Sequence, residues 1–169
     1  MAIKNMRQII LIPILCYLAL LVQFILFNVF GRWGDPHLLL LVVIFFNLFS
    51  GIRFSLWAAV CAGILQDCFG TMPFGTHIFA YVACAYLSTG VRRCCYERGS
   101  NISRIWMVFC VVTAHAVIMA AVHRMSFGEL RWLDMWGSIW LPEFVATAAV
   151  TLFFFRGLMQ LVIFFRIEA

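Results

Sequence analysis

The chain has 169 residues, of which 65% are hydrophobic and only 11% are charged, and its net charge is +5. A soluble domain usually carries about 25% charged residues. A single core of this size has no room for the excess apolar side chains, so the composition excludes a water-soluble protein and predicts an integral membrane protein. The positive charge does not indicate nucleic acid, because the basic residues lie between apolar segments, where they set orientation and meet lipid headgroups.

Apolar segments long enough to cross a bilayer begin near the N-terminus. A membrane-spanning helix needs about 20 apolar residues, with a usual range of about 17–25, and the segment 9–30 fits. The next segment, 37–65, is too long for one crossing and short for two, and it contains Gly51 and Arg53 in its middle. Because an arginine at membrane depth costs about 2.5–3.5 kcal/mol, we predict two short helices joined by a tight turn at Gly51.

A loop rich in glycine and proline, 68–75, separates these helices from the rest of the chain. Further apolar segments follow it, and the last of them is expected to end at Arg156. The sequence therefore predicts one all-α membrane domain over residues 1–169. Its six transmembrane helices are expected at about 9–30, 36–50, 54–68, 74–91, 105–122 and 138–155.

The positions of lysine and arginine test this number of crossings. With six crossings and a cytoplasmic N-terminus, both termini are cytoplasmic and nine of the 12 basic residues lie inside. The other three, Arg32, Arg124 and Arg131, lie outside, as the positive-inside rule requires. Fusing 36–68 into one crossing would move the basic segment 92–104 to the outside, so the charges favour six crossings.

Asp67 is the first candidate for a functional residue, because a carboxylate at the outer end of the third helix is costly unless it is solvated or paired. Ala59, Gly63 and Asp67 share one helix face through their four-residue spacing. Small residues on such a face let another helix approach closely. Two interpretations of Asp67 stay open: hydrogen bonds to backbone groups of the following loop, or contact with a partner or ligand.

Other ionisable residues are expected near the same side of the membrane. Glu143 opens the sixth helix, where it either pairs with a cation or interacts with the helix dipole. His77 lies early in the fourth helix, so Asp67, His77 and Glu143 could converge in one outward-facing pocket. Their spacing is not that of a tight metal site, and we predict neither a metal nor a cofactor. His115, in the middle of the fifth helix, is predicted to be a packed, hydrogen-bonded histidine.

Motifs that carry enzyme chemistry are absent from the sequence. It contains no nucleophile elbow, phosphate-binding loop, dinucleotide fingerprint or HExxH pair. Its seven cysteines include no CxxC pair and are predicted to be free thiols. The sequence therefore predicts a protein that is not an enzyme.

The segment from Asp35 to Val91 contains an ordered set of features. An Asp-Pro-x-Leu-Leu-Leu run opens the second helix, and a short polar turn follows. The later features are Gly63 and Asp67 in a Gly-x-x-x-Asp pattern, then Gly70 and Gly75, and a Tyr86-Leu87 pair late in the fourth helix. In order and spacing these features resemble the MreD family, the rod-shape-determining membrane proteins of bacteria.

The resemblance implies a non-enzymatic role in the bacterial cytoplasmic (inner) membrane, within the elongation machinery that builds lateral-wall peptidoglycan. The implied partners are MreC, the glycosyltransferase RodA, a class B penicillin-binding transpeptidase and, indirectly, MreB filaments, besides membrane lipid. No nucleic acid is implied. The resemblance also implies a fold related to the substrate-binding subunits of energy-coupling-factor vitamin transporters, which have six helices and an outward-facing pocket.

That relation supplies an alternative function, a small-molecule uptake subunit. Such subunits often carry an Ala-x-x-x-Ala motif in the first helix, where it docks their transport partner. The segment 9–30 contains only Ala19, and the small-x-x-x-small pairs fall in the third helix instead, at Ala58/Ala62 and Ala59/Gly63. This distribution favours the scaffold function. An intramembrane enzyme has no catalytic constellation to support it.

Overall fold

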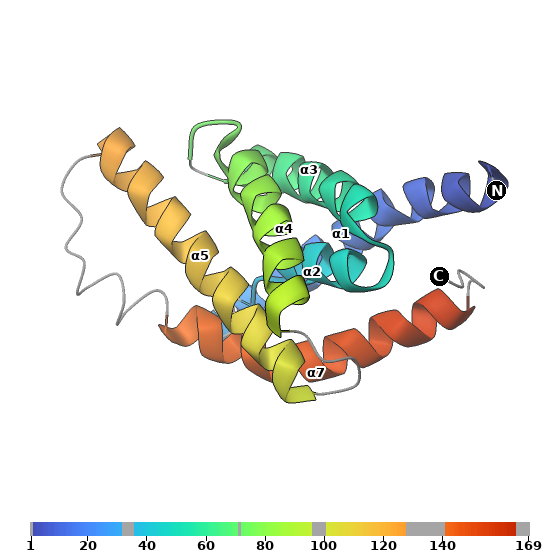
Figure 1. Cartoon of the computed structure of the whole chain (residues 1–169). Coiled ribbons are helices and arrows are strands. Elements are labelled where there is room, and N and C mark those ends of the chain that lie inside the picture. The colour runs from blue at the N-terminus through green and yellow to red at the C-terminus, as the bar shows by residue number, and fades with distance from the viewer. Residues whose placement is uncertain (1, 32–35, 71, 96–100, 128–140, 165–169) are drawn as a thin grey trace.

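The computed structural model describes residues 2–31, 36–70, 72–95, 101–127 and 141–164. Within these ranges the chain forms six helices and no strand (Figure 1). The helices are α1 (Ala2–Phe30), α2 (Leu38–Phe49), α3 (Ile52–Phe69), α4 (Thr76–Cys95), α5 (Asn101–Phe127) and α7 (Leu141–Phe164). The beginning of α1 and the end of α7 lie on the same side of the molecule (Figure 1). The predicted all-α class is confirmed, and each predicted segment overlaps one of these helices.

Three helices contain apolar segments long enough to cross a membrane, at Ile10–Val29, Ile52–Phe69 and Ile105–Met125. α2 is also apolar but shorter. Large apolar side chains cover the outer surface as well as the interior; Ile25, for example, is 61% exposed and Val29 65% exposed. A soluble monomer rarely exposes contiguous apolar surface on this scale, so this exterior fits contact with lipid.

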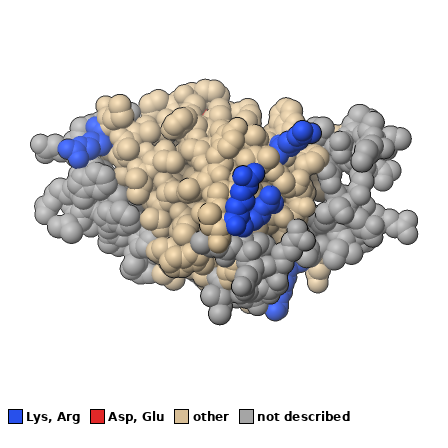
Figure 2. Space-filling model, in the orientation of Figure 1, with Lys and Arg blue, Asp and Glu red and all other residues tan. Residues whose placement is uncertain are grey.

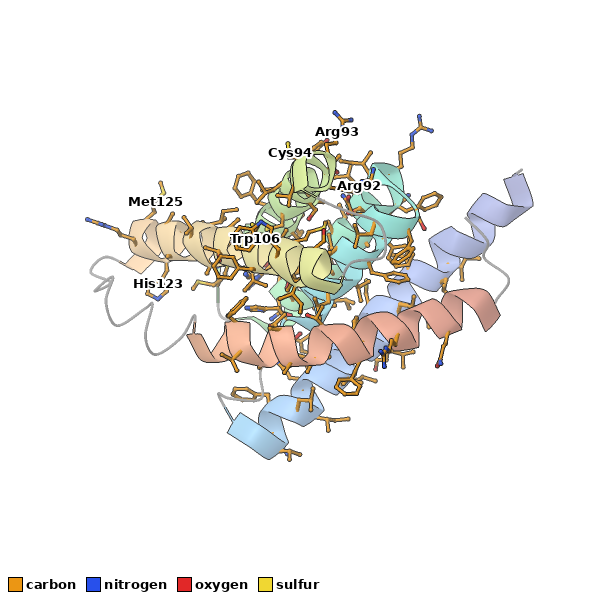
Figure 3. All side chains as sticks on the ribbon, turned by 60° about the horizontal axis from the view of Figure 1, so that its bottom comes forward. Arg92, Arg93, Cys94, Trp106, His123 and Met125 are labelled. Atoms are coloured by element: carbon orange, nitrogen blue, oxygen red, sulfur yellow. The ribbon has the colours of Figure 1, made fainter. Side chains whose placement is uncertain are left out.

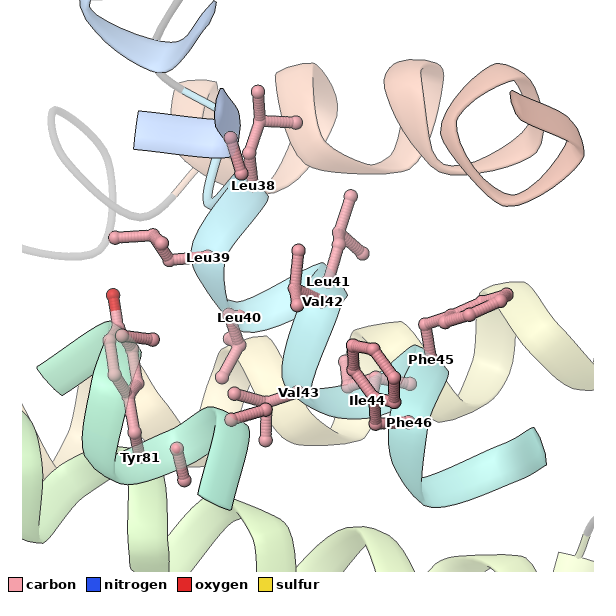
Figure 4. Packing of buried hydrophobic residues seen from close by; sticks show 14 of the residues in the cluster. Leu38, Leu39, Leu40, Leu41, Val42, Val43, Ile44, Phe45, Phe46 and Tyr81 are labelled. Carbon is pink, nitrogen blue, oxygen red and sulfur yellow. The ribbon is translucent and has the colours of Figure 1, made fainter. Parts of the chain in front are cut away.

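The core of the molecule is α2. Every residue from Leu38 to Asn47 is buried, and Figure 4 shows its side chains extending in several directions, with Tyr81 of α4 nearby. A helix that is apolar all round must be covered on every side, and α1, α3, α4, α5 and α7 all contact α2. The run of leucine, valine, isoleucine and phenylalanine therefore marks the central helix.

The predicted turn between the second and third helices is confirmed at Gly51. Its φ angle is +88°, in the left-handed region that a residue with a Cβ atom avoids. The Ser50 N–H donates to the Phe46 carbonyl and closes α2. α3 then begins at Ile52, two residues before the predicted boundary, and so Arg53 belongs to its first turn.

Several helix boundaries differ from the predicted ones, and the largest differences are the start of α1, at Ala2 rather than 9, and the end of α7. The second helix was expected from 36 but begins at Leu38, and the His37 N–H just before it donates to Thr147 Oγ1 of α7 at 3.0 Å. The sixth helix was expected to end at 155, but α7 continues through Arg156 to Phe164. Arg156 is exposed, so its long side chain can extend toward the headgroups without ending the helix.

Candidate functional site

At one end of the α3–α4 pair, the Asp67 carboxylate caps the first turn of α4. Its Oδ2 accepts hydrogen bonds from the N–H of Gly75 at 2.9 Å and of Ile78 at 3.4 Å, and its Oδ1 accepts one from the N–H of His77 at 3.0 Å. The first N–H groups of a helix have no partner within it, and a negative charge there is favoured by the helix dipole. The structure thus shows the first interpretation of Asp67, hydrogen bonds to backbone groups.

Small residues bring α3 and α4 close together beside this cap. A Cβ atom at Gly63 would lie 2.5 Å from the Ile78 Cα, which is too close for any side chain. Ala59, one turn earlier on the same face, is completely buried. Ile78 is also one of the residues whose N–H Asp67 accepts, so the close packing and the cap depend on each other.

The connection between the two helices relies on two of the predicted glycines. Gly75, whose N–H reaches Asp67, has a φ angle of +99°. At Gly70 a Cβ atom would lie 2.9 Å from the Gln66 carbonyl oxygen and 3.5 Å from His77 Nε2. The structure therefore brings five of the predicted site residues together at what we call the Asp67 end: Gly63, Asp67, Gly70, Gly75 and His77. The sixth, Ala59, lies two turns before Asp67 on α3.

The seventh predicted residue, Glu143, lies in the first turn of α7. Its side chain is outside the part of the chain that the structure describes. The convergence of Glu143 with Asp67 and His77 in one pocket therefore stays a prediction.

The His77 ring belongs to an aromatic group that joins α4, α5 and the residue before α2. His115 of α5 lies in its middle, with ring centroids 4.9 Å from His37, 5.3 Å from Tyr81 and 6.4 Å from His77. His115 is packed, as predicted, but its Nε2 and the His77 Nδ1 are buried without a hydrogen-bond partner. Among the described residues, no group of three His, Cys, Asp or Glu side chains is arranged to hold a metal ion. The six cysteines whose side chains are described are all free thiols.

A second polar group, which sequence reasoning missed, lies at the other end of the α3–α4 pair. Asn47 of α2 is completely buried. Its Nδ2 donates to the Ala85 carbonyl at 3.0 Å and to Thr89 Oγ1 at 2.8 Å, both in α4, and lies 3.4 Å from Ser55 Oγ in α3. Ser55 Oγ in turn donates to the Val43 carbonyl of α2 at 3.0 Å. One amide thus connects three helices.

Arg92 completes this group, which we call the Asn47 end. Its guanidinium donates to the backbone carbonyl of Asn47 in the last turn of α2, where a positive charge complements the helix dipole. Arg92, Arg93 and Cys94 lie together at the C-terminal end of α4 (Figure 3). The available signal in the sequence was Asn47 itself, a lone amide after nine consecutive apolar residues, since a buried polar group needs partners.

These observations define a helical membrane protein whose buried polar side chains mainly fasten helix ends to one another. A comparison with known protein families matches residues 4–162 to rod shape-determining protein MreD. The match covers almost the whole chain, so the chain belongs to the MreD family of rod-shape-determining membrane proteins. The resemblance predicted from residues 35–91 is confirmed and extends well beyond them.

Neither the search of curated proteins nor that of solved structures found a match. MreD proteins are shape-determining structural proteins rather than a family of enzymes. The comparisons give no support to the alternative of a small-molecule uptake subunit.

Proposed function

We propose that the chain crosses the bacterial cytoplasmic membrane six times, with both termini in the cytoplasm. Three helices are long and apolar enough to cross without help. The start of α1 and the end of α7 lie on the same side of the molecule (Figure 1), which an even number of crossings requires. Arg92 and Arg93 lie in the last turn of α4, so the positive-inside rule assigns the Asn47 end to the cytoplasm and the Asp67 end to the outside.

The short second helix is compatible with this topology because protein surrounds it. With 12 residues, α2 is about 18 Å long, well short of the ~30 Å hydrocarbon core. Backbone that is not helical is tolerated at membrane depth only where protein or water shelters it. Five helices contact α2 and cover it. A fold related to the vitamin-transporter subunits is part of the same proposal.

Within this topology we assign the chain the role of a non-enzymatic scaffold that binds MreC and supports lateral-wall peptidoglycan synthesis and rod shape. RodA and a class B penicillin-binding transpeptidase are the further partners, and MreB is an indirect one. The observation that carries the proposal is the Asp67 cap, because it fixes the loop between α3 and α4 from a buried position. Membership of the MreD family supports the role itself.

A fixed loop is suited to binding because its conformation is already ordered before the partner arrives. Ordering a flexible loop during association costs free energy, which a preorganised loop avoids. Phe69 and Phe74, at the two ends of this loop, are 62% and 71% exposed. The anchored loop therefore presents aromatic side chains at the outer side of the membrane, where a partner such as MreC can contact them.

The cellular test is depletion of the protein in its rod-shaped host. We expect rods to become round and wild-type protein supplied in trans to restore them. Cells that keep their width but lose uptake of one small molecule would contradict the scaffold function and favour the uptake subunit.

The molecular test is co-purification with MreC from membranes. Asp67→Ala is expected to reduce the MreC recovered per folded molecule, and Asp67→Asn to reduce it less. Phe74→Ala leaves the cap intact and should also lower recovery if the loop is the contact. Arg124→Gln, an exposed residue of α5, serves as the control. Unchanged recovery with Asp67→Ala and Phe74→Ala would show that this loop does not bind MreC.

A further inference from the structure

Two exposed arginines lie at the Asn47 end of the α3–α4 pair. Arg53 lies in the first turn of α3 and Arg93 in the last turn of α4, and both side chains are exposed. Neither forms a hydrogen bond or an ion pair with any other described residue. The face of the molecule shown in Figure 2 carries several basic side chains and no acidic one among the described residues. Both charged groups are therefore accessible to a ligand from outside the chain.

The hydrogen bonds of Asn47 place the two arginines at the same level. Its Nδ2 contacts both Ser55 of α3 and Thr89 of α4, so these two residues lie side by side. Arg53 is two residues before Ser55, and Arg93 is four residues after Thr89. Because α3 and α4 are antiparallel neighbours, both arginines lie beyond Asn47 in the same direction, by about 3 Å and 6 Å along the helices.

Directly next to the arginines, toward the membrane interior, the outer surface is aromatic and apolar. Trp57 is four residues after Arg53, on the same face of α3, and is 52% exposed. Tyr86, on α4, is 59% exposed. Between Tyr86 and Arg93, a Cβ atom at Gly90 would meet no atom within 4 Å, so the helix surface is open there. Tryptophan and tyrosine favour the headgroup region of a bilayer.

We propose that Arg53 and Arg93 bind the headgroup phosphate of an anionic phospholipid in the inner leaflet, with its acyl chain along the surface between Trp57 and Gly90. Arginine suits this ligand because its planar fork binds phosphate oxygens bidentately. An anion here also offsets the unfavourable position of a cation in the first turn of α3. The apolar surface next to the charges favours a lipid over a soluble anion or an acidic protein. The inference rests on the proposed topology, which assigns this end to the inner leaflet.

The test compares purified full-length protein in nanodiscs of phosphatidylethanolamine with nanodiscs that also contain phosphatidylglycerol. Native mass spectrometry after release should show phosphatidylglycerol retained by the wild type. For the double variant Arg53→Gln/Arg93→Gln we expect roughly thirtyfold weaker retention, since a basic residue near an anionic surface contributes about a factor of five. Arg124→Gln, which changes an arginine in the last turn of α5, is the control and should retain the lipid as the wild type does.

Three results would overturn the proposal. The first is equal retention of phosphatidylglycerol by the double variant and the wild type. The second is retention of phosphatidylethanolamine by the wild type as strong as that of phosphatidylglycerol. The third is displacement of the lipid by inorganic phosphate at millimolar concentration, which would identify a soluble anion as the ligand. Arg92 is not varied, because it holds the end of α2. The assay contains no MreC, so a failure of the scaffold function does not affect its outcome. A double variant that loses lipid binding but still co-purifies normally with MreC would show that MreC binding does not depend on this lipid.

Discussion

Buried polar side chains hold both ends of the α3–α4 pair, but the two ends bind different backbone groups. At the Asp67 end, one carboxylate accepts three backbone N–H groups at the start of α4. At the Asn47 end, an amide, two hydroxyls and a guanidinium hold carbonyl groups and one another. The anion lies at the beginning of one helix and the cation at the end of another, as the direction of helix dipoles favours.

The difference lies in what would remain if the central side chain were removed. Without Asp67, the three N–H groups have no other side-chain acceptor among the described residues. Without the Asn47 side chain, Thr89 Oγ1 still donates to the Ala85 carbonyl at 3.1 Å, and Ser55 Oγ still donates to the Val43 carbonyl. The Asp67 end therefore depends on one residue, whereas the Asn47 end has alternatives. Loss of a partner is most costly where a buried group is left unsatisfied, so the two ends should respond unequally to mutation.

The largest expected effect is that of Gly63→Ala, which attacks the packing beside the Asp67 cap. The new Cβ would lie 2.5 Å from the Ile78 backbone, so α3 and α4 would have to separate. We expect a loss of about 3 kcal/mol or more in the free energy of unfolding, at the upper end for overpacking. Equilibrium unfolding in mixed micelles measures it. Gly90→Ala, with open space around the Cβ, should be neutral or slightly stabilising; equal effects at the two glycines would contradict the close packing.

The next effect is that of Asp67→Ala, which removes all three acceptor contacts of the cap. We expect a loss of about 2–3 kcal/mol, because buried N–H groups lose a charged acceptor. Asp67→Asn keeps one oxygen and should lose about half as much. Unfolding in micelles again provides the measurement, and Cys68→Ala, an exposed neighbour, is the control. An Asp67→Ala protein as stable as the wild type would show that water or another group satisfies the start of α4.

Most of the Asp67 end could be predicted from the sequence. A carboxylate among apolar residues needs a partner, and four-residue spacing alone places Ala59, Gly63 and Asp67 on one face. The sequence did not reveal that the acceptor oxygens reach His77 and Ile78 beyond the loop, because that depends on how closely the glycine face lets α4 approach. Choosing between a backbone cap and a partner contact required the position of a second helix.

A smaller effect is expected for Asn47→Ala at the other end. The Thr89 and Ser55 hydroxyls keep their carbonyl partners, and the contact of Arg92 with the Asn47 backbone is unaffected. We expect a loss of about 1–2 kcal/mol, from neutral hydrogen bonds and a small cavity. The same unfolding assay gives the ratio to Asp67→Ala. A loss larger than that of Asp67→Ala would reverse the comparison between the two ends.

The Asn47 end was not predicted because a hydropathy pattern considers each of its residues separately. Asn47 appears as one polar residue in an apolar run, Ser55 as a small residue after the turn, and Arg92 as one of several inner charges. These residues connect the helices only because they lie close enough to form hydrogen bonds, and that proximity depends on the antiparallel register of α3 and α4. The same limit applies to the start of α2 and the end of α7, because hydropathy shows neither the contact of His37 with Thr147 nor the continuation of α7 past Arg156.

The smallest expected effect is the coupling between the two ends, measured by the double variant Asp67→Ala/Asn47→Ala. Ser55 and Asp67 are 12 residues apart on α3, or about 18 Å, and the two groups share no hydrogen-bond partner. Distant independent sites add within about 0.3–0.5 kcal/mol, so the double variant should lose about the sum of the single losses. A larger coupling energy would mean that α3 and α4 transmit strain as one rigid body, and that a change at the Asn47 end alters the loop at the Asp67 end.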